Sequence, residues 1–213
     1  RVGYDPVLDA LATTVRGDQP VLFVVDDSNE AFRALKLSQD TGASVLLAGL
    51  ANPTALADRM AEEGRPLLLS LDLPDALEDE DADSTASEPP HDATRTFSYE
   101  SLDAETATLQ SKRRAALERV ESGARVLDSL GVAFAFALFD MKPGEIHGNL
   151  RRLIDAGLPE DAALAALTTA AAALLDLGAT MGTVEAGKMA NLVVTDGSYF
   201  DAESTVQMVF VDG

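Results

Sequence analysis

Uninterrupted apolar runs alternate with amphipathic segments along the first third of the chain. VLFVV at 21–25, ASVLLAG at 43–49 and PLLLSLDL at 66–73 are apolar runs of strand length. Such runs are typical of strands buried on both faces of a parallel sheet. Two segments with helical spacing of apolar residues, 30–39 and 54–63, separate them. The pattern predicts consecutive βαβ units with right-handed crossovers.

Between residues 74 and 106 this pattern is lost. The segment is rich in Asp, Glu, Ser and Pro and poor in apolar residues, so it cannot offset its ordering entropy by burial. The EDEDAD run lacks the glycine-centred spacing of a calcium loop. We predict a solvated acidic loop, mobile in part, with His91 exposed and without a role.

Helical spacing returns at 109–130 and is followed by the apolar strand VAFAFALF at 132–139. Two further helices are predicted, over 145–155 and 159–177. The tail then changes period, and 182–188, 190–197 and 204–213 read as short strands with Asp-Gly turns. We therefore predict an α/β body over residues 1–180 and part of a small β domain over 181–213.

The composition narrows the classes of partner. With 36 acids against 16 bases the net charge is −20, and this surface offers no clustered positive charge for phosphate. We expect no nucleic-acid partner, and no apolar run is long enough to span a membrane. The charge suits a high-salt cytosol, or an ordinary protein whose acidity one loop exaggerates. Without cysteine the chain has neither disulfides nor thiolate chemistry, which leaves cytoplasm and periplasm both open.

The run from Ala163 to Gly197, together with the VFVDG end, carries a specific pattern: a Leu-Thr helix, spaced glycines, a Gly-Lys pair and a strand ending in glycine. It resembles the C-terminal signature of metal-dependent amidohydrolases of the imidazolonepropionase-like group. Asn191 departs from the aspartate usual at its position, in a turn beside the β domain. The matching residues are Leu167, Thr168, Gly178, Gly182, Gly187, Lys188, Ala190, Leu192, Asp196, Val209, Val211 and Gly213.

The resemblance implies a fold and a reaction. The fold is a TIM-like (β/α)8 barrel with a small β-sandwich, of which this α/β chain would be the C-terminal half, because a whole barrel needs about 250 residues. The reaction is hydrolysis of carbon–nitrogen bonds other than peptides, in a small-molecule amide or a ring. The family uses one or two divalent metals, zinc, iron or manganese, at the C-terminal ends of the strands.

Most of the metal ligands that the resemblance implies are missing. The His-x-His pair of the first barrel strand would precede Arg1. The fifth-strand histidine falls at Val24 or Val25, and the sixth-strand histidine at Ala48 or Gly49. We therefore expect no cofactor in this portion.

Two residues remain candidates for catalysis at the barrel mouth. Asp140 matches the eighth-strand aspartate, which binds metal and accepts a proton in the family, although it equally suits a polar turn. His147 follows it at the start of a helix, where it could also be a packing residue. Asp26 and Asp27 end another strand, and the four together support at most weak Mg²⁺ or Ca²⁺ binding.

The first residue is Arg1 rather than Met, and we expect both ends to continue in a longer protein. A half-barrel leaves sheet edges and inner faces bare. We predict a homodimer, pairing with the missing half, or coverage by the 74–106 segment. The alternative to a hydrolase is a non-catalytic barrel domain that serves binding or packs against a catalytic half.

Overall fold

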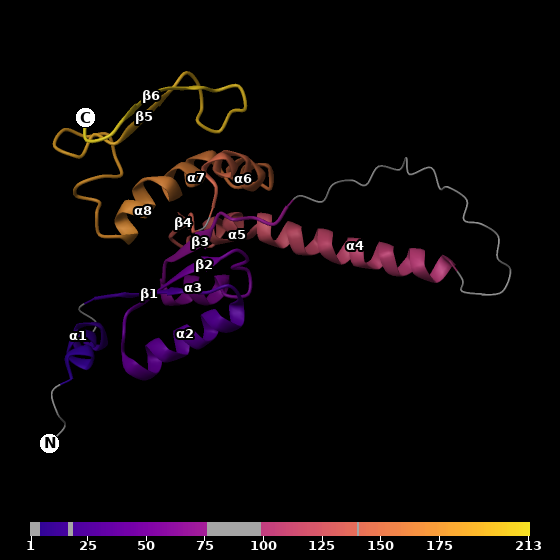
Figure 1. The fold of residues 1–213 in the computed structure, drawn as a ribbon, viewed down its shortest axis with the longest axis horizontal. Coiled ribbons are helices and arrows are strands. Elements are labelled where there is room, and N and C mark those ends of the chain that lie inside the picture. Colours follow the sequence, from indigo (N-terminus) through magenta and orange to yellow (C-terminus); the bar gives the residue numbers. More distant parts are fainter. Residues whose placement is uncertain (1–4, 17–18, 76–98, 140) are drawn as a thin grey trace.

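The structure is a computed structural model that describes residues 5–16, 19–75, 99–139 and 141–213. Within them the chain forms a four-stranded parallel sheet with helices and a separate two-stranded sheet (Figure 1). The four strands lie in chain order: β1 (Val21–Val24), β2 (Val45–Leu50), β3 (Leu67–Ser70) and β4 (Phe134–Ala137). All three pairings are parallel, which confirms the predicted α/β class.

Local sequence explains where the helices between the strands begin and end. The Asp27 side chain caps α2 by accepting bonds from the backbone amides of Asn29 and Glu30, and Gly42 closes that helix in the left-handed conformation. Gly64 closes α3 in the same way. The helices are α1 (Pro6–Val15), α2 (Ser28–Thr41), α3 (Ala57–Glu63), α4 (Tyr99–Glu121), α5 (Gly123–Ser129), α6 (Pro143–Asp155), α7 (Glu160–Leu167) and α8 (Thr169–Leu174).

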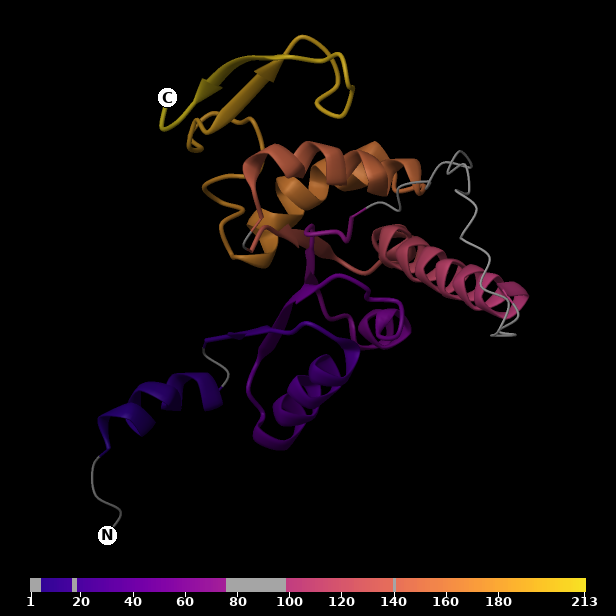
Figure 2. The ribbon, with the colours of Figure 1, turned by 45° about the vertical axis from the view of Figure 1, so that its right-hand side comes forward.

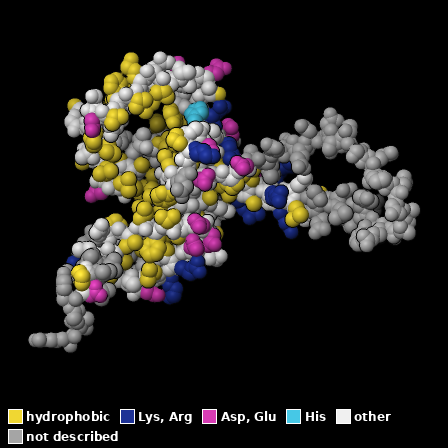
Figure 3. Space-filling model, viewed as in Figure 1, with side chains coloured by type: hydrophobic (Ala, Val, Ile, Leu, Met, Phe, Trp, Pro, Cys, Tyr) yellow, Lys and Arg dark blue, Asp and Glu magenta, His cyan; other side chains and the backbone are white. Residues whose placement is uncertain are grey.

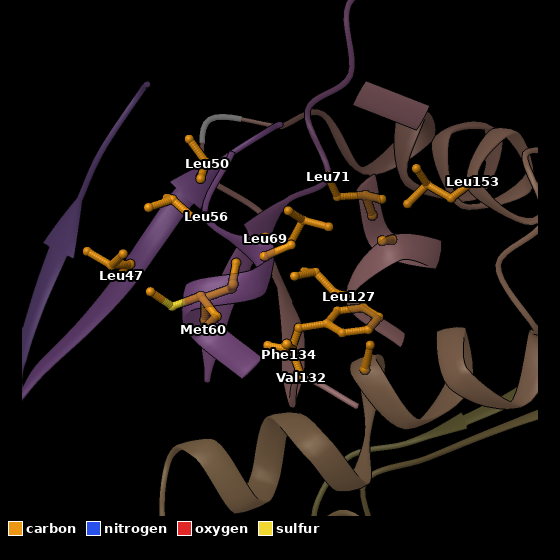
Figure 4. Close-up of a cluster of buried hydrophobic side chains, with 14 of the residues drawn as sticks. Leu47, Leu50, Leu56, Met60, Leu69, Leu71, Leu127, Val132, Phe134 and Leu153 are labelled. Carbon is orange, nitrogen blue, oxygen red and sulfur yellow. The ribbon is translucent and has the colours of Figure 1, made fainter. Parts of the chain in front are cut away.

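The main core lies between one face of the sheet and the helices that follow its strands. Leu47, Leu69 and Phe134 point from three strands toward Met60 of α3 and Leu127 of α5 (Figure 4). Each is at most 5% exposed. Full burial of such a side chain contributes about 1.5–3 kcal/mol, so this cluster stabilises the sheet-helix layer.

The opposite face of the sheet carries a second, smaller hydrophobic cluster. Ala48, Leu68, Ala135 and Ala137 form this cluster, on which Ala171 and Leu174 of the α7–α8 region pack. Toward the β1 edge this face is uncovered. We call it the inner face, because it is the one that a barrel would enclose.

The structure corrects the predicted helices in three ways. The helix expected over 109–130 begins at Tyr99, inside the segment predicted as loop, and divides at Ser122 into α4 and α5. A Cβ on Gly123 would lie 2.6 Å from Pro53 Cδ, so the loop after β2 presses on the chain where the helix divides. The helix expected over 159–177 divides at Thr168, whose backbone is non-helical. Helix α1 was not predicted.

The tail forms one hairpin, β5 (Leu192–Thr195) and β6 (Val206–Phe210), and no strand at 182–188. Asp196-Gly197 does not make the tight turn that the sequence suggested. Instead, residues 196–205 form a longer loop in which Asp196 accepts bonds from the backbone and side chain of Thr205. The pattern of short strands was therefore right for two of the three segments.

The loop between β5 and β6 attaches the hairpin to the α/β body. Phe200 is 7% exposed within the main core, and Tyr199 packs beside it. Ser198 Oγ also lies 3.1 Å from Glu160 Oε2 at the start of α7. After a 45° turn the hairpin is seen to lie over α6–α8, with α1 apart at the other end (Figure 2).

None of the helices among the described residues combines the length and the apolar character needed to cross a bilayer.

Candidate functional site

The candidate site is the edge of the sheet at which its parallel strands end. Strand register aligns Val24 with Ala48, Ala48 with Leu68, and Leu68 with Ala135 across all four strands. Three members of this row belong to the inner-face cluster, so the row runs across the inner face. Ligand sites of parallel barrels lie at the C-terminal ends of the strands, on the enclosed side.

On β1 the two alternative positions for the absent histidine differ in burial. Val25 is 3% exposed and belongs to the helix-side core, whereas Val24 lies in register with Ala48 and is 59% exposed. The inner-face positions are therefore Val24 and Ala48. Both side chains are hydrocarbons and cannot bind a metal.

Gly49 interrupts β2 directly after this row. Its φ of +92° lies in the region that side-chain-bearing residues rarely adopt, and the β2–β3 register shifts between Ala48 and Leu50. A Cβ at this position would lie 3.2 Å from the carbonyl oxygen of Val25 and 3.3 Å from Val24 Cγ1. This strand end is shaped for glycine, which allows the backbones of β1 and β2 to approach each other.

The acids that follow β1 have local partners. Asp27 Oδ1 accepts from the Asn29 amide at 2.7 Å and from the Glu30 amide at 2.9 Å, and so caps α2. The amide of Asp26, one residue before the cap, donates to Glu30 Oε2 at 3.1 Å. These contacts give Asp27 a structural role.

Of the two candidate catalytic residues, Asp140 lies outside the described residues. His147 is half-buried on α6, and its Nε2 lies 2.8 Å from the carbonyl oxygen of Tyr199. The two aromatic rings meet edge to face with centroids 5.7 Å apart. His147 thus contacts the loop between β5 and β6, while its catalytic role stays a prediction.

The structure does not bring His147 together with Asp26 and Asp27. These acids follow β1 and His147 follows β4, the two outer strands of the sheet. Three strand spacings of about 4.8 Å separate those strands. Over the described ranges no three His, Cys, Asp or Glu side chains gather as a metal site would require. The donor set of these ranges therefore does not fit the divalent metal that the resemblance implies.

Two side chains of α6 hold the segment that leaves β3 at the mouth of the half-barrel, and no pattern in the sequence predicted either contact. Asn149 Nδ2 donates to the carbonyl oxygen of Leu71, just after β3, at 3.0 Å. Arg152 donates to the carbonyl oxygen of Pro74 at 2.8 Å and pairs with Glu121 of α4 at 2.9 Å. These bonds fix the loop that leaves β3 against α6. They join residues far apart in sequence, so a local pattern cannot predict them.

The signature residues of the tail are structural in this fold. Lys188 Nζ donates to the carbonyl oxygen of Gly178 at 2.9 Å and to Thr183 Oγ1, and so closes the loop between α8 and the hairpin. Asn191 Oδ1 accepts from the Asp212 amide at 2.9 Å, a bond that an aspartate could also accept. The departure at Asn191 therefore preserves the contact.

The one perturbed acid of the hairpin is exposed. Hydrogen bonds from the Thr205 side chain, and then from the Thr205 amide, lower the pKa of Asp196 below its ordinary value of 3.8. An open hollow of about 530 Å³ beside it is lined by Asp201, Glu203 and Ser204 as well. This loop belongs to the hairpin rather than to the strand ends of the barrel.

Sequence comparison matches this chain to a known family. The sequence model described as the amidohydrolase family matches residues 74–213. No curated protein matches the chain.

Solved structures share the fold. An amidohydrolase from Thermotoga maritima MSB8 superposes with a TM-score of 0.69 at 19% identity over 100% of this chain and 47% of its own. Another amidohydrolase gives 0.60 at 16% identity, over 95% and 46%. A prolidase complexed with N-methylphosphonate-L-proline gives 0.56 at 22% identity, over 94% and 45%. The chain thus spans about half the length of the solved structures it matches, and its sheet is the C-terminal half of a TIM-like barrel.

Proposed function

This chain belongs to the amidohydrolase family, and from that premise we propose that it is the C-terminal half of a barrel whose complete form hydrolyses carbon–nitrogen bonds of small, non-peptide molecules. We propose further that β1 and β2 supply the frame of the site rather than metal ligands, and that Asp140, which follows β4, is the catalytic residue of this half. The observation that carries the second part is the inner-face row that starts at the end of β1, in which Val24 and Ala48 stand at positions where histidines are expected.

In this proposal residues 1–180 form barrel units five to eight, and 181–213 contribute to a small β domain. The burial of Phe200 and the contact between His147 and Tyr199 support the division, because they hold the hairpin at a fixed place on α6 and α7. Of the segment between 74 and 106, residues 76–98 lie outside the described part of the chain, and its predicted mobility stays a prediction.

The partner that completes the fold must cover two exposed apolar surfaces and two unpaired strand edges. Leu22 and Val24 on the inner face of β1 are 47% and 59% exposed. Among the described residues β1 and β4 each have one unpaired edge. Hydrophobic side chains also reach the surface over the hairpin and across the sheet (Figure 3). The exposed hairpin residues include Val193, Val194, Val206, Met208, Val209 and Phe210.

Unpaired parallel edges with an exposed apolar face favour association, because water would otherwise contact both. The missing N-terminal half would cover these surfaces within one longer polypeptide, and a second copy of the chain is the other arrangement we consider. Sedimentation of the 213-residue chain in molar KCl tests the second arrangement: a compact monomer would exclude the homodimer.

The second candidate function is a barrel that binds or packs without catalysis. Val24 and Ala48 are compatible with it as well, because these two residues offer a hydrolytic metal no nitrogen or oxygen donor. Under this alternative the Asn149 and Arg152 contacts still hold the segment after β3 in place, and the barrel binds a small molecule there without hydrolysing it.

The deciding experiment uses the longer protein that contains this chain. The protein is purified, its metal content is measured, and it is assayed on acyl amides, cyclic amides and Xaa-Pro dipeptides. We expect turnover of a non-peptide amide that Asp140→Asn abolishes, with Asp176→Asn, on an exposed turn, as the matched control. Absence of turnover across the panel would reject the hydrolase and leave the binding domain.

A further inference from the structure

We infer that the inner face of β1 and β2 is an apolar wall that does not fit the divalent metal that the family implies. The inference rests on the proposed half-barrel, because it concerns the face that a barrel encloses. It goes beyond the proposed function in assigning these two strands a property of their own: they offer a ligand hydrocarbon contacts and give a metal no donor.

The first observation is the combination of exposure and register at Val24. Its side chain is 59% exposed on the inner face, directly opposite Ala48 on the neighbouring strand. Leu22, two residues earlier on the same face, is 47% exposed, and its partner Leu46 packs on the inner-face cluster. Four adjacent inner-face residues of β1 and β2 therefore have hydrocarbon side chains: Leu22, Val24, Leu46 and Ala48.

The second observation is that the backbone is adapted to this arrangement. Gly49 has a φ of +92°, and a Cβ there would lie within 3.3 Å of both Val25 O and Val24 Cγ1. A histidine at residue 49 would be strained and would press on β1. The close approach of the two strand ends therefore depends on glycine, which a metal ligand at this position would prevent.

The third observation concerns the nearest oxygen donors. Asp27 uses its Oδ1 to cap α2, which turns it toward the helix that follows β1. Asp26 is exposed beside it, and a lone carboxylate does not hold a divalent ion. Desolvating a cation against a hydrocarbon wall is unfavourable, so this end of the sheet favours an uncharged apolar group of a ligand.

The test asks whether zinc binding depends on the side chains of this wall. Zn²⁺ is titrated calorimetrically into the 213-residue chain and into Leu22→His/Val24→His. The variant places two imidazoles on one face of β1, at the spacing of residues i and i+2. Both replaced side chains are exposed in the structure, so the fold should tolerate the change, which far-ultraviolet circular dichroism checks.

We expect the variant to bind one Zn²⁺ at least tenfold more tightly than the unmodified chain. The matched control, Leu22→His/Leu164→His, adds two imidazoles at similarly exposed positions on separate elements and should bind no more tightly than the unmodified chain. Unmodified chain binding zinc as tightly as the variant would overturn the inference. A folded variant without any gain would also overturn it, because the side chains would then not decide metal binding.

These outcomes are separate from those of the proposed function. The titration is made on this chain alone and needs no turnover. A longer protein that hydrolyses no amide would reject the hydrolase and leave the zinc result unchanged. Conversely, if the unmodified chain binds zinc as tightly as the variant, the inference is wrong even when the longer protein hydrolyses an amide.

Discussion

Replacement of Gly182 by alanine tests whether the signature glycines of the tail are required by steric fit. Gly182 has a φ of +98°, and a Cβ there would lie 2.7 Å from Ala172 Cβ in α8 and 3.3 Å from the carbonyl oxygen of Thr168. Alanine at residue 182 would therefore lower the stability of the fold in two ways, through its backbone conformation and through the overlap of its Cβ with Ala172. Both effects act on the packing of the tail against the α7–α8 junction.

The magnitude can be worked out from these two costs. A residue with a side chain held in a sparsely populated φ region costs about 1–3 kcal/mol. Overpacking by a methyl group in a close contact costs about 1–3 kcal/mol more. Gly182→Ala should therefore destabilise the fold by about 2–6 kcal/mol.

Two neighbouring signature glycines separate the costs. Gly187 has a φ of +95° with nothing within 4 Å of its Cβ position, so Gly187→Ala carries the conformational cost alone. Gly178 has neither a positive φ nor a close neighbour, and Gly178→Ala should change stability by less than about 0.5 kcal/mol. The expected order of destabilisation is Gly182→Ala, then Gly187→Ala, then Gly178→Ala.

Urea unfolding followed by far-ultraviolet circular dichroism measures the three variants against the unmodified chain. High KCl concentration keeps the −20 charge screened in each titration. If Gly182→Ala is no more destabilising than Gly187→Ala, the contact with Ala172 does not constrain the tail, and the steric reasoning is refuted.

Three further predictions concern the attachment of the tail, the mouth loop and the hairpin. Phe200→Ala should cost about 3–5 kcal/mol in urea unfolding, because Phe200 is buried in the main core, whereas Phe210→Ala, on the exposed hairpin, should cost less than about 1 kcal/mol. Arg152→Ala should cost about 1–3 kcal/mol by removing charged hydrogen bonds, against less than about 0.5 kcal/mol for Lys36→Ala, whose ion pair is exposed. Because hydrogen bonds lower the pKa of Asp196, its carboxylate stabilises the hairpin loop above pH 3.8, and the protection of the loop amides, measured against their intrinsic exchange rates, should fall as pH falls through the folded-state pKa.

Each of these three predictions has an outcome that would contradict it. Equal losses for the two phenylalanine variants would mean that the hairpin is not attached through Phe200. Arg152→Ala behaving like Lys36→Ala would show that the loop after β3 needs no contact with α6. If Asp196→Asn leaves the acid-induced loss of protection unchanged, the pH dependence has its origin elsewhere.

The sheet was predictable because its signals are local. Apolar runs of strand length, separated by Asp27 at one helix start and Gly42 at its end, specify βαβ units within short windows. The divisions of two predicted helices were not predictable. The first of these helices divides at Ser122, where the next residue, Gly123, meets Pro53 from a loop much earlier in the chain. The tight turn predicted at Asp196-Gly197 was also wrong, because Asp196 accepts a hydrogen bond from Thr205 across a longer loop.

The candidate site was predictable only in part. The sequence shows that no histidine stands near the ends of the first two strands, but it left Val24 and Val25 as equal alternatives. Register and burial assign Val24 to the inner face. The partner of His147, the carbonyl oxygen of Tyr199, lies in another element and has no sequence signature. Contacts between distant segments depend on the folded chain, which periodicity does not encode.

The sequential strand order has a consequence for how the chain folds. The connections from β1 to β2 and from β2 to β3 span 25–44 and 51–66, whereas the connection from β3 to β4 spans 71–133. Closing the longer loop costs roughly 1 kcal/mol more in chain entropy. We therefore expect β1–β3 to pair first, with β4 joining in a later and slower step. Pulsed hydrogen exchange would detect this as protection of Leu47 before Ala135.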